Sequence, residues 1–155
     1  MDANGAVGIR AVDYSEVAKH RSAAAKEHVS LADAKHVIWF QIVKAEEVVG
    51  AVGLMLMAGA RVRIKGFYVL AKVRGLGIGT NASDAVEAYA IRELQAREIE
   101  VYAYNREFYE GRGFQAVGKR PNGAVLLRKG TGRDPQPAAE PLADYYTNAT
   151  LAEKG

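Results

Sequence analysis

The stretch that decides the fold reads Arg74-Gly75-Leu76-Gly77-Ile78-Gly79-Thr80. It follows a strand-like run at 61–70 and opens a helix-like run at 80–97. Three glycines at alternate positions leave the backbone without covering side chains where the strand is followed by the helix. Backbone N–H groups in such a turn point outward, and the positive end of the helix dipole adds to them. The stretch therefore predicts a socket for an anion, most often a phosphate or pyrophosphate.

The spacing of the glycines excludes two common phosphate-binding loops. A Walker A loop needs a lysine directly after its last glycine, and Thr80 follows Gly79 instead. A Rossmann fingerprint needs its third glycine at the position of Thr80 and normally follows the first strand of a βαβ unit. What remains is the pattern Arg-x-x-Gly-x-Gly, formed by Arg74, Gly77 and Gly79. For the loop alone, a glycine-rich turn without a ligand is an equal alternative.

The rest of the chain alternates strand-like and helix-like segments. Its apolar pattern predicts strands at 6–12, 37–44, 48–57, 61–70, 99–104, 114–119 and 124–128. Helices are predicted at 15–29 and 80–97, with a short helical turn at 106–111. Asn122-Gly123 between the last two apolar runs is typical of a hairpin, so these strands should be antiparallel neighbours. The order of elements predicts a mixed α/β fold of the α+β class.

Composition fits one domain and a short tail. The chain has 155 residues, of which 49% are apolar, and this is enough for a single core. We place that domain at 1–129 and a Pro/Ala-rich tail at 130–155, either flexible or ending in a short helix. The chain has no cysteine, so disulfides and thiolate metal sites are excluded. With no apolar run near membrane-spanning length and no recognisable secretion signal, we expect a cytoplasmic protein.

A second motif stands about thirty residues after the glycine stretch, at Tyr109-Glu110-Gly111-Arg112-Gly113-Phe114. Together with Asn105 before it, this motif resembles the Tyr-x-x-x-Gly-Phe pattern of GNAT N-acyltransferases. The Arg-x-x-Gly-x-Gly loop is similar to the acyl-CoA pyrophosphate loop of the same superfamily. The order of elements also matches, and the resemblance covers roughly 37–128. It implies a GNAT-like fold, with a central, mostly antiparallel twisted sheet flanked by helices.

The resemblance also implies the activity, which is transfer of an acyl group from acetyl-CoA, or another acyl-CoA, to an amine. The amine would attack the thioester directly in a ternary complex, with no metal. N–H groups of the glycine loop would hold the pyrophosphate, and the strand end at 68–70 would hold the pantetheine arm. The implied cofactor-binding residues are Tyr68, Val69, Arg74, Gly75, Leu76, Gly77, Ile78, Gly79, Thr80 and Asn105.

Tyr109 is the implied catalytic residue. A phenol can give its proton to the departing thiolate if the two groups lie close together. The spacing from Asn105 to Tyr109 is shorter than usual for the family, which predicts a shortened helix. The general base stays unassigned, because the strand at 61–70 contains no acid. Glu100 is the nearest candidate, and a solvated strand carboxylate is the favoured interpretation of it.

The strand at 61–70 carries Arg61, Arg63 and Lys65 at alternate positions, so one face of it is cationic. An exposed strand face explains this pattern, and a subsite for an anionic acceptor is the alternative. The acceptor is expected to be a small-molecule or protein amine. The other functions left open are a GNAT-like enzyme acting on a nucleic acid or nucleotide, which is not favoured, and a non-catalytic CoA-binding module.

Two further features complete the expectations from the sequence. His20, His28 and His36 have no cysteine or carboxylate cluster to join, so we predict no metal site. Tyr145, Tyr146 and Leu151 in the tail are large enough to dock on the domain or on a second copy of the chain, so a homodimer stays open.

Overall fold

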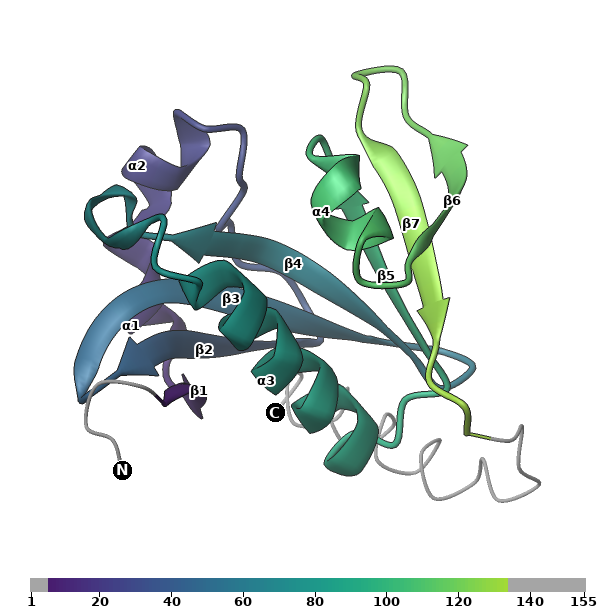
Figure 1. Cartoon of the computed structure of the whole chain (residues 1–155), viewed down its shortest axis with the longest axis horizontal. Coiled ribbons are helices and arrows are strands. Elements are labelled where there is room, and N and C mark those ends of the chain that lie inside the picture. Colours follow the sequence, from purple (N-terminus) through teal and green to yellow (C-terminus); the bar gives the residue numbers. More distant parts are fainter. Residues whose placement is uncertain (1–5, 134–155) are drawn as a thin grey trace.

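The computed structural model describes residues 6–133. Its centre is a seven-stranded sheet in the order β1-β2-β3-β4-β5-β7-β6 (Figure 1). Neighbouring strands are antiparallel, except that β4 and β5 run parallel. The strands are β1 (Val7–Ala11), β2 (Val37–Lys44), β3 (Glu47–Met57), β4 (Arg61–Val69), β5 (Glu98–Ala103), β6 (Gln115–Lys119) and β7 (Val125–Gly130). The predicted α+β fold with a mostly antiparallel sheet is confirmed.

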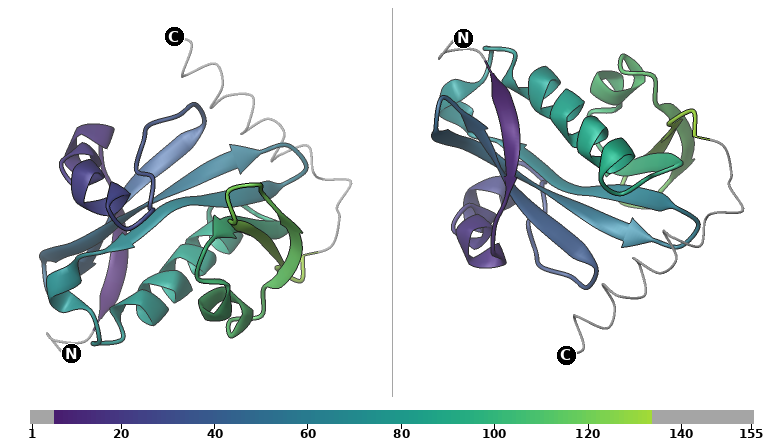
Figure 2. Two further views of the ribbon diagram at one scale, coloured as in Figure 1. Left: turned by 90° about the horizontal axis from the view of Figure 1, so that it is seen from above. Right: turned by 90° about the horizontal axis from the view of Figure 1, so that it is seen from below.

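Helices cover both faces of the sheet (Figure 2). The short helices α1 (Tyr14–Ala18) and α2 (Arg21–Ala25) lie on one face. The long helix α3 (Ile78–Arg92) lies on the other, together with the single-turn helix α4 (Arg106–Glu110). A short 3-10 turn, η1 (Ala71–Val73), joins β4 to the glycine stretch. Each face has its own core, and the side chains of α3 and α4 share the larger one with β2–β5 and β7.

Two predicted helices differ from those in the structure. The run at 15–29 forms α1 and α2 rather than one helix, and His28 then takes a φ of 64° that turns the chain. Helix α3 begins at Ile78, two residues early, because Gly77 caps it with a φ of 76°. It ends at Arg92 rather than 97, since Gln95 adopts a φ of 54° that breaks the helical path. Neither His28 nor Gln95 is a glycine or proline, so helix propensities could not predict that the helical path ends there.

The last hairpin is as predicted. Strands β6 and β7 are antiparallel neighbours, and Gly123 turns the chain between them with a φ of 96°. Strand β7 ends at Gly130, and the hydroxyl of Thr131 donates a hydrogen bond of 2.7 Å to the carbonyl of Ala96. The tail expected from 130 lies, from 134 onward, outside the described residues. Among the helices at 6–133, none has the length and apolarity needed to cross a membrane.

Candidate functional site

The site begins where β4 and β5 stop pairing. The two strands are in register from Arg61 opposite Glu98 to Ile64 opposite Val101, and no pairing continues beyond that point. Gly66 bends β4 with a φ of 63°, and the carbonyl of Ser30 lies too close to leave room for a side chain there. The strands therefore separate toward their C-terminal ends, as Figure 1 shows.

A cavity of about 810 Å³ fills the space between the separated strands. Five segments line this cavity: the loop after α2, the second half of β4, the glycine stretch with the start of α3, the end of β5, and α4 with the β6–β7 hairpin. The predicted site residues that line it are Tyr68, Val69, Arg74, Gly75, Gly77, Ile78, Gly79, Thr80, Asn105 and Tyr109. Leu76 does not line it, and its side chain is 62% exposed.

The glycine stretch presents free backbone amides at the cavity. Asn81 donates the first intrahelical bond of α3, 3.1 Å to the carbonyl of Gly77. The N–H groups of 78–80 precede this bond, so helix geometry gives them no partner, and the N-cap Gly77 has no side chain to supply one. Because the helix dipole adds positive potential at the same point, these amides have the geometry to bind a phosphate group, and the predicted pyrophosphate contact stays a prediction.

Arg74 does not point its charge at this socket. Its guanidinium donates two hydrogen bonds, of 2.7 and 3.0 Å, to the carbonyl of Val69. It also forms an ion pair with Glu27 at 2.6 Å. The side chain therefore ties the glycine stretch to the end of β4 and to the loop after α2. A direct contact with a pyrophosphate would require the guanidinium to leave these partners.

The end of β4 has one open backbone edge. Leu70 donates its N–H to the carbonyl of Val49 on β3 at 2.9 Å, so the amide of Leu70 is not free to hold a pantetheine arm. Successive amides of a strand point in opposite directions. The N–H of Val69 therefore points away from β3, toward the gap between β4 and β5. The amide of Val69 is therefore open to a ligand, and its pantetheine-binding role stays a prediction.

Tyr109 lies in the cavity wall, on the single turn of α4 that the short spacing from Asn105 predicted. Its side chain is buried, and its ring packs edge-on against Phe108 and Phe114, with centroids 5.0 and 5.4 Å away. The hydroxyl has no hydrogen-bond partner within 6–133. Burial raises the pKa of this phenol, so it stays protonated at neutral pH.

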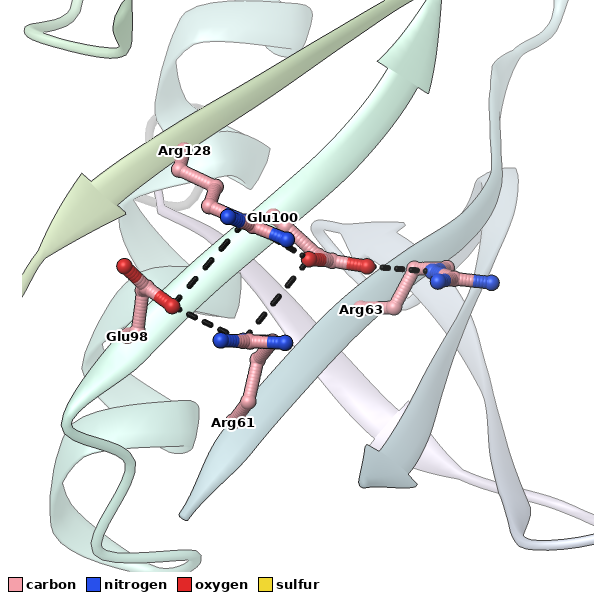
Figure 3. Close-up of polar contacts among 5 residues, drawn as sticks. All are labelled: Arg61, Arg63, Glu98, Glu100 and Arg128. Carbon is pink, nitrogen blue, oxygen red and sulfur yellow. Dashed lines mark hydrogen bonds and ion pairs between the residues drawn. The ribbon is translucent and has the colours of Figure 1, made fainter. Parts of the chain in front are cut away.

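Glu100 is neither solvated nor placed to act as a base, which corrects the interpretation drawn from the sequence. Its side chain is 1% exposed and accepts hydrogen bonds from Arg63 at 2.7 Å and from Arg128 at 3.1 Å (Figure 3). Burial alone would raise the pKa of Glu100, but the two arginines outweigh it and hold the pKa below its usual value. A carboxylate held in this way is a poor proton acceptor.

The cationic face of β4 is likewise not free. Arg61 pairs with Glu98 at 2.8 Å, and Arg63 pairs with Glu100 across the same strand boundary (Figure 3). Two of the three cations that suggested an anionic subsite are therefore paired with glutamates of β5. Lys65, the third, lines the cavity.

Several cavity residues gave no signal in the sequence. Glu27 and His28 come from the loop after α2, whereas Tyr102, Phe108 and Arg120 come from the far side of the cavity. The ring of His28 lies 5.6 Å from that of Tyr104, centroid to centroid. These residues belong to no contiguous motif, because the fold brings them together from separate segments.

Comparisons with known proteins agree with this architecture. The family model described as "Acetyltransferase (GNAT) family" matches residues 7–114, and the chain belongs to that family. No curated protein matches the chain. Among solved structures, the aminoglycoside acetyltransferase AAC(6')-Ib in complex with coenzyme A and kanamycin is 17% identical, with a TM-score of 0.63. That match covers 81% of this chain and 95% of the other.

Two further solved structures show the same fold. A putative acyl-CoA N-acyltransferase from Klebsiella pneumoniae is 20% identical over 83% of this chain and 99% of its own, with a TM-score of 0.65. N-acetylglutamate synthase from Neisseria gonorrhoeae, complexed with coenzyme A and N-acetyl-glutamate, is 17% identical with a TM-score of 0.67. This second match covers 84% of this chain and 36% of the synthase.

Proposed function

We propose that this protein is an acetyl-CoA-dependent N-acyltransferase in which an amine attacks the thioester directly within a ternary complex. The observation that carries the proposal is a single cavity shared by three features. These are the free amides at the start of α3, the open edge of β4 at Val69, and the buried phenol of Tyr109. Membership of the GNAT family and the CoA complexes of its structural neighbours support an acyl-CoA as the co-substrate.

The thioester supplies the activated carbonyl, and the chain positions the two substrates and handles the protons. The amides of 78–80 hold the pyrophosphate, and the N–H of Val69 holds the pantetheine arm. The amine nitrogen then forms a bond to the carbonyl carbon, and the carbon–sulfur bond breaks. Tyr109 stays protonated at this stage because its pKa is raised. It donates a hydrogen bond to the departing thiolate and passes its proton to the sulfur, and the proton that the amine gives up is returned to the phenol, so that no buried phenolate is left.

We assign the proton acceptor for the attacking amine to His28. Within the described cavity wall, Glu27 is the one carboxylate, and it is paired with Arg74. Glu100 forms ion pairs with Arg63 and Arg128, and it does not line the cavity. Histidine is the side chain that most often serves as a general base, so His28 suits this task better than the tyrosines around it. His28 would take up the proton that the nitrogen loses as the new bond forms.

Two other functions remain as alternatives. A nucleic acid acceptor loses support, because Arg61 and Arg63 are neutralised by Glu98 and Glu100. A non-catalytic CoA-binding module is still supported, because β4 carries no acid that could act as a base. Glu100 on the neighbouring strand β5 is bound by Arg63 and is not available as one.

The test uses the purified full chain. Mass spectrometry identifies any bound cofactor, calorimetry measures CoA affinity, and release of free thiol from acetyl-CoA is followed against a broad panel of amines. Amine-dependent thiol release supports the transferase. Tight CoA binding without thiol release above the amine-free rate, for every amine in the panel, would replace it with the non-catalytic module.

A further inference from the structure

Charged residues on β4 and β5 form a regular ladder. Arg61 lies opposite Glu98 and Arg63 opposite Glu100 in the parallel register. Both rungs close as ion pairs, at 2.8 and 2.7 Å. Side chains two residues apart share one face of a strand, so Lys65 is the next cation on β4. The residue two positions after Glu100 on β5 is Tyr102, which is not an acid like Glu98 and Glu100.

The third position of this series therefore has a cation, Lys65, on β4 and no acid on β5. In its place, Arg120 brings a second cation from the end of β6, with its guanidinium carbon 3.7 Å from the centroid of the Tyr102 ring. Within 6–133, no carboxylate lies within 4.0 Å of the charged groups of Lys65 or Arg120. Both residues line the cavity.

Lys65 is half-buried, Arg120 is exposed, and the two cations lie close enough to repel each other. Burial lowers the pKa of Lys65, and the charges of Arg63 and Arg120 lower it further. The carboxylates that could relieve this repulsion are engaged elsewhere, because Glu100 is bound by Arg63 and Arg128 and Glu27 by Arg74. Two cations that line one cavity without a carboxylate partner are placed to pair with an anion that enters it.

We propose that Lys65 and Arg120 form a subsite for a carboxylate or phosphate group on the amine acceptor. The acceptor is then a small amine that also carries an anionic group. Acetyl-CoA itself is also anionic, but the free amides at 78–80 already provide its pyrophosphate socket beyond the end of β4. This inference rests on the proposed transferase function. It disfavours polycationic acceptors such as the kanamycin bound by the structural neighbour, because they would meet like charge at the subsite.

The test compares matched pairs of amines that differ only in the anion. O-phosphoethanolamine is paired with ethanolamine, and β-alanine with β-alaninamide, in thiol-release assays with acetyl-CoA; kanamycin serves as a cationic acceptor. We expect kcat/KM to be at least about 10-fold higher for the anionic member of one pair, the scale of one charge-assisted hydrogen bond. The pair with the larger ratio distinguishes phosphate from carboxylate.

Variants connect this preference to the subsite. Lys65→Gln and Arg120→Gln should each lower the anionic-to-neutral ratio about 10-fold. Arg92→Gln removes an exposed cation at the end of α3, outside the cavity, and should keep the ratio. Equal use of both members of each pair, or a ratio unchanged in the Lys65→Gln/Arg120→Gln double variant, overturns the inference while leaving the transferase intact.

A binding measurement separates the inference from the proposed function. O-phosphoethanolamine and β-alanine are each titrated by calorimetry into the complex of the full chain with CoA. Binding that weakens about 10-fold in Lys65→Gln but not in Arg92→Gln supports the subsite even if no thiol is ever released. No binding of either probe, in a protein that acetylates neutral amines, excludes the subsite and keeps the transferase.

Discussion

The two halves of the β4–β5 pair differ in what happens to their polar groups. In the paired half, from Arg61 to Ile64, the arginines of β4 form ion pairs with the glutamates of β5, of which Glu100 is buried. In the separated half, Lys65 has no acid opposite it and Val69 has an amide without a neighbouring strand. The same alternation of side chains thus stabilises the sheet at one end and leaves groups for a ligand at the other. Both strand separation and the change from glutamate to Tyr102 on β5 divide the paired half from the site.

The largest expected effect is on the paired half. Glu100→Gln removes the buried charge that Arg63 and Arg128 share, and leaves two partly buried guanidinium groups without it. We expect the free energy of unfolding to fall by about 3 kcal/mol, the scale of breaking a buried ion pair. Urea unfolding at neutral pH measures this loss. CoA affinity of the folded variant should stay within about twofold of the parent; a larger change would show that the two halves are coupled.

The same carboxylate makes a pH prediction. Because the pKa of Glu100 is lowered in the folded protein, its stabilisation is present above its usual pKa of 4.5 and is lost as the pH falls through the lower folded value. The stability difference between the parent and Glu100→Gln should therefore shrink in acid. Urea unfolding from pH 7 down to pH 3 measures it, and a difference that stays constant would contradict the assignment.

In the separated half, Tyr109→Phe should lower turnover by about 100-fold, the usual scale for a positioned acid. The phenyl ring keeps the contacts with Phe108 and Phe114, so CoA affinity and melting temperature should stay unchanged. Thiol-release kinetics and calorimetry measure the two effects separately. Full activity at every pH would end the assignment, and Tyr104, exposed at the end of β5, would be the next donor to test.

Gly79→Val should weaken CoA binding by about 30-fold. A Cβ at this position would meet one atom of Phe108, at 3.9 Å, so the fold tolerates it, but the valine methyl groups would cover the amides at the start of α3. Calorimetry with CoA measures the affinity. Gly8→Val is the matched control, because nothing lies within 4 Å of a Cβ at Gly8 on β1. Unchanged affinity in folded Gly79→Val would exclude the glycine stretch from the site.

His28→Asn should lower kcat/KM about 10-fold at neutral pH, the weak end of general-base effects, because the side chain is exposed. Asparagine tolerates the positive φ of this position, so the loop after α2 should keep its path. The defect should shrink as the pH rises, since more of the amine is then already deprotonated. A defect independent of pH would assign His28 a positioning role instead.

The smallest expected effect is that of the tail. Deleting 134–155 should change the melting temperature by less than about 2 °C, because β7 and the bond from Thr131 to Ala96 lie before the cut. Scanning calorimetry measures it. A large drop would show that the tail docks on the domain or on a second copy.

The sequence alone determined the order of the elements, the hairpin at Asn122-Gly123, the glycine stretch and the Tyr109–Phe114 motif. These features depend on local rules: apolar periodicity, the conformations open to glycine, and short motifs in which neighbouring residues act together. The family followed from them. The residues of the predicted cofactor site, apart from Leu76, line one cavity for the same reason.

Only the tertiary structure decided what the charges do. Arg63 and Glu100 are 37 residues apart, and Arg128 joins them from 28 residues further on, so no local pattern could show that they neutralise one another. The motif predicts that Arg74 contacts a phosphate, yet in the structure its guanidinium donates hydrogen bonds to the carbonyl of Val69. Lys65 differs from Arg61 and Arg63 because the strands part beside it and because β5 carries Tyr102 there instead of a glutamate. A charge acts on a ligand when the fold leaves it unpaired, and pairing across strands is a property of register.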